Sequence, residues 1–187
     1  MTHSIATNLP VLSTGRLTLK PLAPSSEGAV QEFQAVFRRA QSFIYVTQGR
    51  APTDADAERL MKLLPPQAQE DDKLVLGVYV QSEIVGCATV VRAYPKNTAL
   101  FIGLLLISEQ FQRRSIGAET LRHIESLAIS WGHDTLEIVV DSANERGHAF
   151  WVREGFTEQS RKRSTGFVGD VIVMERRVVS SSVTALP

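Results

Sequence analysis

Apolar and polar positions recur along the chain with two different periods, and the changes between them mark the predicted elements. Residues 16–22 alternate with a period of two, which is typical of a half-buried strand. After residue 27 the period lengthens, because Val30, Phe33, Val36 and Phe37 recur every three or four positions. The N-terminal part therefore predicts one strand followed by an amphipathic helix.

Two helices in this region carry start signals. The first is predicted to follow Ser25 or Ser26, because serine oxygens cap free backbone N–H groups. The second covers residues 53–64, where Thr53 and Asp56 have the spacing of a capping box. Two consecutive prolines, Pro65 and Pro66, end it.

The remainder of the chain predicts a β-rich centre and an alternating C-terminal part. Apolar, β-branched runs at residues 73–80, 83–94 and 99–107 predict a three-stranded antiparallel meander. The predicted elements that follow are a helix from about Ser115 to Ser130, a strand at 135–140, a helix at 144–154, and strands at 156–163 and 170–178. A strand, a helix and a strand in succession predict that 99–107 and 135–140 lie parallel.

Length and composition restrict the class of protein. The 187 residues suit one domain, with a core of about 16–178 and flexible tails at 1–10 and 180–187. Lys plus Arg and Asp plus Glu both total 20, so we expect no surface devoted to nucleic acid or anionic membrane. One cysteine excludes an internal disulfide, the longest apolar run is far too short for a membrane span, and no signal peptide is apparent. We therefore expect a cytoplasmic protein.

The segment "QRRSIGA", residues 112–118, combines small residues and arginines at the predicted start of a helix. The first amides of a helix have no internal partner and point outward with the positive end of the helix dipole. Small residues there let a phosphate approach the backbone closely. Neither the dinucleotide-binding nor the P-loop glycine pattern is present, so the pattern favours an anion seat of another kind.

This segment resembles the acyl-CoA signature Q/R-x-x-G-x-G/A of the GNAT acetyltransferase superfamily. Ser115 stands in place of the first glycine, and Gly117 is the second. Residues 144–156, "NERGHAFWVREGF", are similar to the family's second signature, N-x-x-A-x-x-F-Y-x-x-x-G-F, with Gly147 in place of alanine and Trp151 in place of tyrosine.

The opening "STGRLTLKPL" also resembles the first strand of the ribosomal-protein and antibiotic acetyltransferase branch, so the resemblance covers roughly residues 16–178. It implies an α/β fold with a mixed, mostly antiparallel sheet of six or seven strands. That sheet would be split between the fourth and fifth strands and flanked by about four helices.

The resemblance also implies a co-substrate, acetyl-CoA, with its pantetheine arm in the split and its pyrophosphate on the amides of the turn. The amide of Leu105 or Leu106 is the candidate donor to the oxyanion that forms during transfer. Between Arg113 and Arg114, the second is our choice for a charged contact to the CoA phosphates. The implied cofactor-binding residues are Leu104, Leu105, Leu106, Gln112, Arg113, Arg114, Ser115, Ile116, Gly117, Ala118, Asn144, Phe150 and Trp151.

Proton transfer has no obvious agent, because an indole at Trp151 cannot act as an acid and the strand 99–107 contains no carboxylate. His148 is the candidate catalytic group, since Asn144, His148 and Trp151 share one helical face. A hydrogen-bonded core histidine is the alternative. Tyr94 and Cys87 are weaker candidates for the acid, and core packing is the better interpretation of Cys87.

Two functions follow from these observations. One is an N-acetyltransferase that acts on a primary amine of a small molecule or of a protein N-terminus; the other is a non-catalytic CoA-binding or sensing module. The acceptor pocket is expected from the first two helices and the loops at residues 42–53 and 93–97. The four histidines and one cysteine show no metal-ligand spacing, so no metal is expected. Homodimers are common in the family, but nothing in the sequence decides this point.

Overall fold

An eight-stranded sheet, in the order β1-β2-β3-β4-β5-β6-β8-β7, organises the chain. The computed structural model describes residues 12–163, 166 and 168–178. Its strands are β1 Leu12–Thr14, β2 Leu17–Pro21, β3 Lys73–Val80, β4 Glu83–Arg92, β5 Ala99–Ile107, β6 Thr135–Asp141, β7 Thr157–Lys162 and β8 Val171–Arg177. The tails that we expected to be flexible, 1–10 and 180–187, lie outside the described residues.

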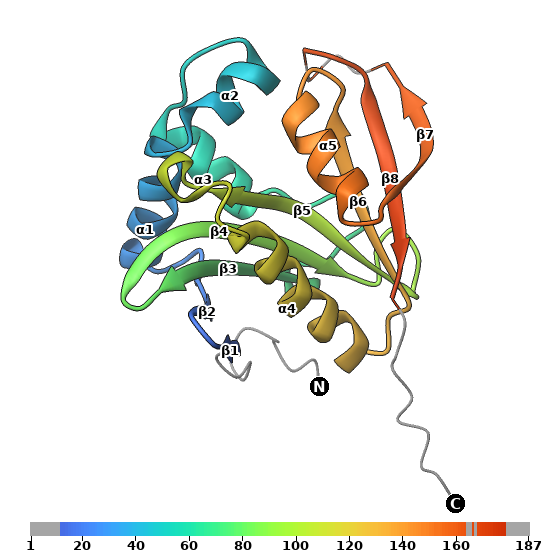
Figure 1. Ribbon diagram of the computed structural model, residues 1–187, viewed down its shortest axis with the longest axis horizontal. Coiled ribbons are helices and arrows are strands. Elements are labelled where there is room, and N and C mark those ends of the chain that lie inside the picture. Colours follow the sequence, from blue (N-terminus) through green and yellow to red (C-terminus); the bar gives the residue numbers. More distant parts are fainter. Residues whose placement is uncertain (1–11, 164–165, 167, 179–187) are drawn as a thin grey trace, which may run out of the picture.

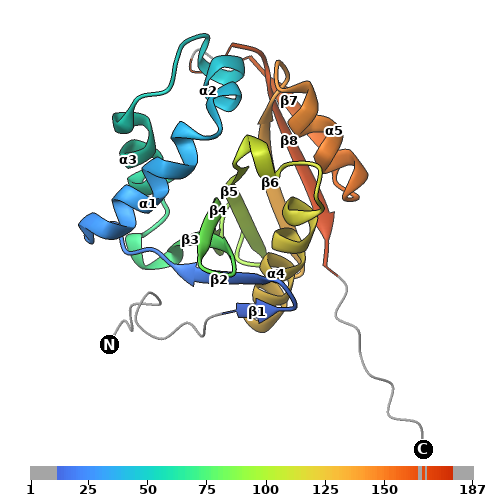
Figure 2. The ribbon, with the colours of Figure 1, turned by 60° about the vertical axis from the view of Figure 1, so that its left-hand side comes forward.

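Within the described residues, five α-helices cover the two faces of this sheet (Figures 1 and 2). They are α1 Glu27–Arg38, α2 Gln41–Gln48, α3 Asp54–Lys62, α4 Ile116–Ser130 and α5 Glu145–Arg153. Helices α1 to α3 pack in one apolar cluster on one face, while α4 and α5 contribute to the main cluster on the other. None of the helices in the described ranges is long and apolar enough to cross a membrane.

The expected start signals of the first helices are confirmed. Ser26 Oγ accepts the N–H of Ala29 at 3.4 Å. The Asp56 carboxylate accepts the N–H of Thr53 at 2.8 Å, and Arg50 donates to the same carboxylate. These contacts lower the pKa of Asp56, with the hydrogen bond from Arg50 as the largest cause.

The fold class is confirmed, although the described residues include one more strand and one more helix than expected. The additional strand is β1, a three-residue edge. The additional helix is α2, so the expectation of a loop at residues 42–53 is wrong for its first half. Ala40 precedes α2 without a side-chain cap, and only Ile44 and Thr47 of the helix are buried. Packing decides whether such a short helix without a start signal forms, and Ile44 packs in the same apolar cluster as α1 and α3.

The sheet opens between β5 and β6. These strands pair in parallel, as predicted, but only over Ala99–Ile102 and Thr135–Ile138. Beyond this point β5 remains paired with β4 as far as Ile107, while β6 remains paired with β8 as far as Asp141. The predicted split is therefore present, and its two sides are held by different neighbouring strands.

A β-bulge lies where the strands part. Thr89 of β4 pairs with Leu104 and Val90 pairs with Ile102, which leaves Gly103 as an extra residue in β5. One extra residue reverses the alternation of side chains. Accordingly Ile102 packs in the cluster with α4, whereas Leu104 packs in the cluster with α1 to α3.

Candidate functional site

The β5 side of the opening presents backbone rather than polar side chains. Leu104 and Leu106 are buried against the cluster of α1 to α3, and Leu105 is half-buried against the α4 cluster. A side chain at Gly103 would come within 2.9 Å of Thr89 Oγ1, so glycine keeps this point of the strand narrow. The edge can therefore pair with an extended chain that enters the opening.

The turn between β5 and α4 lies at the mouth of this opening. A short 3₁₀ turn, Glu109–Phe111, leads into it, and Gln112 Nε2 donates to the carbonyl of Ile107 at 2.9 Å. Arg113 and Ser115 adopt left-handed conformations, with φ of 59° and 63°. That conformation is costly for residues other than glycine, so neighbouring contacts must hold the turn.

Ser115 is the N-cap of α4, yet its side chain makes no capping hydrogen bond. Ile116, which follows it, is buried in the core, so its side chain points away from the surface of the turn, and Gly117 and Ala118 are half-buried. The amides of this first turn cannot bond within the helix. These amides are the ones that the sequence analysis proposes as an anion seat, and they follow the end of β5 that has no parallel partner.

Arg16, from the turn between β1 and β2, holds the turn before α4 in place. Its guanidinium donates to the carbonyl of Arg114 at 2.5 Å. It also binds the Glu119 carboxylate through two nitrogens, at 3.2 and 2.5 Å. One side chain therefore fixes the peptide between Arg114 and Ser115 and neutralises a carboxylate beside the seat. The sequence analysis did not identify Arg16, although it lies in the opening strand motif.

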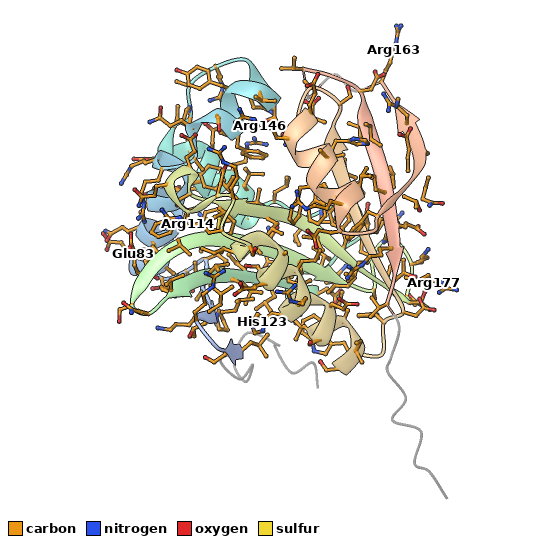
Figure 3. The ribbon with its side chains drawn as sticks, in the orientation of Figure 1. Glu83, Arg114, His123, Arg146, Arg163 and Arg177 are labelled. Carbon is orange, nitrogen blue, oxygen red and sulfur yellow. The ribbon has the colours of Figure 1, made fainter. Side chains whose placement is uncertain are left out.

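Further positive charge surrounds the opening (Figure 3). Arg113 and Arg114 are exposed on the turn, and the Arg114 guanidinium lies 5.6 Å from the centre of the Phe111 ring. Arg146 belongs to α5, on the β6 side. The pKa of Glu109 is lowered first by hydrogen bonds from Ser42 and then by the charge of Arg146, which places Arg146 near the β5 side of the mouth.

The second signature begins α5 and packs against the first. Asn144 Oδ1 accepts the N–H of Gly147 at 3.0 Å, so this oxygen caps α5. A side chain at Gly117 would come within 3.3 Å of the Phe150 ring, which shows that the two signatures touch there. Trp151 is 8% exposed and packs between Phe150 and Phe156 in the core.

Comparison with known families agrees with this arrangement. The model of the acetyltransferase (GNAT) family matches residues 35–156, which include both signatures. The chain belongs to the GNAT acetyltransferase family. No curated protein matches it by sequence.

Solved structures of GNAT proteins share the fold. An acetyltransferase from Thermus thermophilus has a TM-score of 0.70 at 23% identity, covering 87% of this chain and 97% of its own. The Salmonella typhimurium enzyme that modifies the N-terminal serine of 50S ribosomal subunit protein L7/L12 has a TM-score of 0.69 at 15% identity, covering 89% and 97%. The Escherichia coli ribosomal-protein-S18-alanine N-acetyltransferase has a TM-score of 0.63 at 14% identity, covering 91% and 99%.

The structure does not bring His148 of this GNAT acetyltransferase to the opening. Residues two positions apart in a helix point about 200° apart, so His148 and Phe150 face opposite sides of α5. Phe150 faces α4. The pKa of Glu158 on β7 is lowered mainly by Arg161 and in part by His148, so the histidine lies on the β7 side.

The two weaker acid candidates also have packing roles. Cys87 is fully buried in the cluster with α1 to α3, and burial raises the pKa of its thiol. The Tyr94 ring packs edge-on against Phe101, with centroids 5.4 Å apart. In the described part of the chain, no three His, Cys, Asp or Glu side chains come together as a metal site.

One buried carboxylate of the acetyltransferase was missed from the sequence. Glu137 of β6 is 7% exposed and pairs across the sheet with Phe101 on one side and Glu175 on the other. Burial raises its pKa to about 7, with further contributions from the hydrogen bond and charge of Glu175. The available signal was one charged residue inside the apolar run "TLEIVV".

Proposed function

We propose that this acetyltransferase binds acetyl-CoA in the opening between β5 and β6 and transfers the acetyl group directly to a primary amine. The observation that carries the proposal is the uncapped N-terminus of α4 at the mouth of a sheet whose β5 edge has lost its parallel partner. The family match supports acetyl-CoA as the co-substrate.

In this proposal the pantetheine arm runs along β5 beside Leu104, Leu105 and Leu106, pairing with the backbone as an added strand would. The pyrophosphate lies on the amides between Arg113 and Ala118, where the helix dipole and uncapped N–H groups favour negative charge. Arg114 supplies charge on one side of the mouth and Arg146 on the other. The thioester then reaches the bulge at Gly103, where the strands part.

Transfer needs a neutral amine, a donor to the oxyanion and a proton for the leaving thiolate. The amide of Leu105 is our candidate donor, because it follows the bulge and faces the unpaired edge. The proton for sulfur can come from the attacking nitrogen within the tetrahedral intermediate, so no acid is required at Trp151. That fits the burial of the indole in the core.

The acceptor is proposed to be a small or N-terminal amine. The Salmonella enzyme compared above modifies an N-terminal serine, and the Escherichia coli enzyme an alanine of a ribosomal protein. These relatives support a protein α-amine as the first acceptor class to test, with small-molecule amines as the second.

The test separates binding from turnover. Calorimetry with acetyl-CoA is expected to give a dissociation constant in the micromolar range, about −7 to −8 kcal/mol. Release of CoA thiol is then followed with peptides carrying free N-terminal serine or alanine and with a small-amine panel; the same peptides with blocked N-termini are the control. Binding without thiol release from any amine would favour a CoA-binding module. No binding at millimolar CoA would reject the proposal.

A further inference from the structure

A buried carboxyl group lies on the sheet face that α4 does not cover. Leu136 and Ile138 of β6 pack in the cluster that contains Leu121 and Ile124 of α4. Side chains alternate along a strand, so Glu137 points to the opposite face. In the described residues the apolar cluster of α1 to α3 includes no residue of β6 or β8.

Glu137 also lies where the sheet opens. It pairs with Phe101, and the next pair, Ile102 with Ile138, is the last between β5 and β6. The bulge at Gly103 follows at once. A thioester that reaches Gly103 along the β5 edge would therefore end two residue spacings, roughly 6 to 7 Å along the strand, from the pair of Phe101 and Glu137.

The groups that face Glu137 come from three elements. Glu175 of β8 lies directly opposite and binds Lys96, from the loop between β4 and β5, at 3.0 Å. Arg177, further along β8, binds Asp134 at 2.6 Å, so its charge is already neutralised. Phe101 of β5 supplies an aromatic ring on the remaining side, with Tyr94 packed against it. Glu137 thus adjoins one paired carboxylate and one ammonium group.

We propose that Glu137 is the catalytic base that takes the proton from the acceptor amine, an inference that rests on the proposed function. Glu137 carboxylate removes one proton from the bound ammonium, directly or through one water, and later releases it to solvent. The neutral nitrogen forms a bond to the thioester carbon. The carbon–sulfur bond then breaks, and sulfur leaves with the electron pair and takes the second nitrogen proton. The products are an N-acetyl amide and CoA thiol.

The other residues near the opening that could act as a base are absent from β5, face away or are hydrogen-bonded to loops. β5 contains no carboxylate, and His148 lies on the β7 side of α5. Asp141 of β6 accepts N–H groups of Ala143 and Gly169 at 2.8 and 2.9 Å, which ties down two loops. The raised pKa of Glu137, about 7, supports the assignment because a base works best when its pKa is near the working pH.

The experiment measures CoA thiol release from acetyl-CoA with glycinamide as the amine probe, between pH 5.5 and 9. Wild-type kcat is expected to rise with pH through a limb near 7. Glu137→Gln should lower kcat by about 100-fold or more and abolish that limb, with acetyl-CoA affinity unchanged. Glu175→Gln should keep the rate at high pH and move the limb to lower pH, because it removes the neighbouring negative charge. Glu158→Gln, an exposed carboxylate on β7, is the matched control.

Retention of kcat within threefold in Glu137→Gln, or an unmoved limb in Glu175→Gln, would overturn the assignment. Glu137→Gln should fold at least as stably as wild type above pH 7, since it removes a buried charge. If wild type binds acetyl-CoA but releases no thiol with glycinamide, the proposed function fails for this amine. Carbon NMR titration of the Glu137 carboxyl in the acetyl-CoA complex then decides: a midpoint between pH 6 and 8 supports the base, and one below about 5.5 rejects it.

Discussion

Helices α4 and α5 begin in equivalent places in the fold but differ in whether a side chain caps their first backbone N–H groups. Each helix follows one of the two parallel strands that border the opening, α4 after β5 and α5 after β6. At α5, Asn144 caps the helix by accepting the N–H of Gly147. At α4, Ser115 occupies the cap position in a left-handed conformation and gives no such bond.

The difference supports the proposal that the start of α4 binds an anion. At a capped terminus, a side chain already accepts a hydrogen bond from one of the first backbone N–H groups. At an uncapped terminus, those N–H groups can still donate to an external anion. Arg16 holds the carbonyl of Arg114 beside the uncapped terminus, so the turn is fixed without occupying its amides. The start of α4 is therefore the terminus that we propose for the anion, whereas Asn144 closes the start of α5.

Gly117→Val should have the largest effect on the α4 terminus. A side chain at this position would press on Phe150 from 3.3 Å and would crowd a phosphate on the helix amides. We expect CoA affinity to fall by about 30-fold or more in calorimetry. Ala149→Val, an exposed β-branched substitution on α5, is the control and should bind normally. Normal affinity in Gly117→Val would show that the CoA phosphates bind elsewhere.

Arg16→Ala should have the next largest effect. Losing the charge-assisted bonds to the Arg114 carbonyl and to Glu119 releases the turn, so we expect about tenfold weaker acetyl-CoA binding. The kcat at saturating acetyl-CoA should not change, and Arg16→Lys should recover part of the affinity. Arg38→Ala breaks a similar exposed ion pair, between Arg38 of α1 and Asp54 of α3, and should leave binding unchanged. A fall in kcat with unaltered KM would contradict a positioning role.

Asn144→Ala should affect stability rather than binding. Loss of an N-cap costs about 1 kcal/mol, or roughly 2 to 4 °C in Tm for a chain of this size. Acetyl-CoA affinity should stay within threefold, whereas Asn144→Ser should retain most of the stability. A tenfold loss of affinity at unchanged Tm would show that Asn144 contacts the cofactor, as the family resemblance implies.

Ser115→Gly should have the smallest effect. Glycine adopts the left-handed conformation without strain, which stabilises the folded state, but it also raises the conformational entropy of the unfolded state. These two contributions to the free energy of unfolding nearly cancel. The free energy of unfolding, measured by thermal unfolding, should change by less than about 1 kcal/mol in either direction, and acetyl-CoA affinity should remain within twofold. A large loss of affinity would mean that the serine hydroxyl itself contacts the ligand.

The sequence by itself determined the elements whose signals are local. The alternation of period two and the helical spacing placed the long strands and helices, because side-chain burial follows from the period of each element. The caps at Ser26 and Thr53 and the β-α-β order around residues 112–118 were equally readable, since each involves residues a few positions apart. The two signatures then led to the family, and the family match confirmed it.

Only the tertiary structure decided the features that join distant parts of the chain. α2 has no start signal and depends on packing, and the bulge at Gly103 is visible only in the register against β4. Arg16 reaches a turn 98 positions away, and Glu137 meets Phe101 and Glu175 through strand pairing. His148 shares a helical face with Asn144, yet which side of α5 faces the opening depends on how that helix docks. Local periodicity reports whether a side chain is buried, while sheet register and helix docking determine what it is buried against.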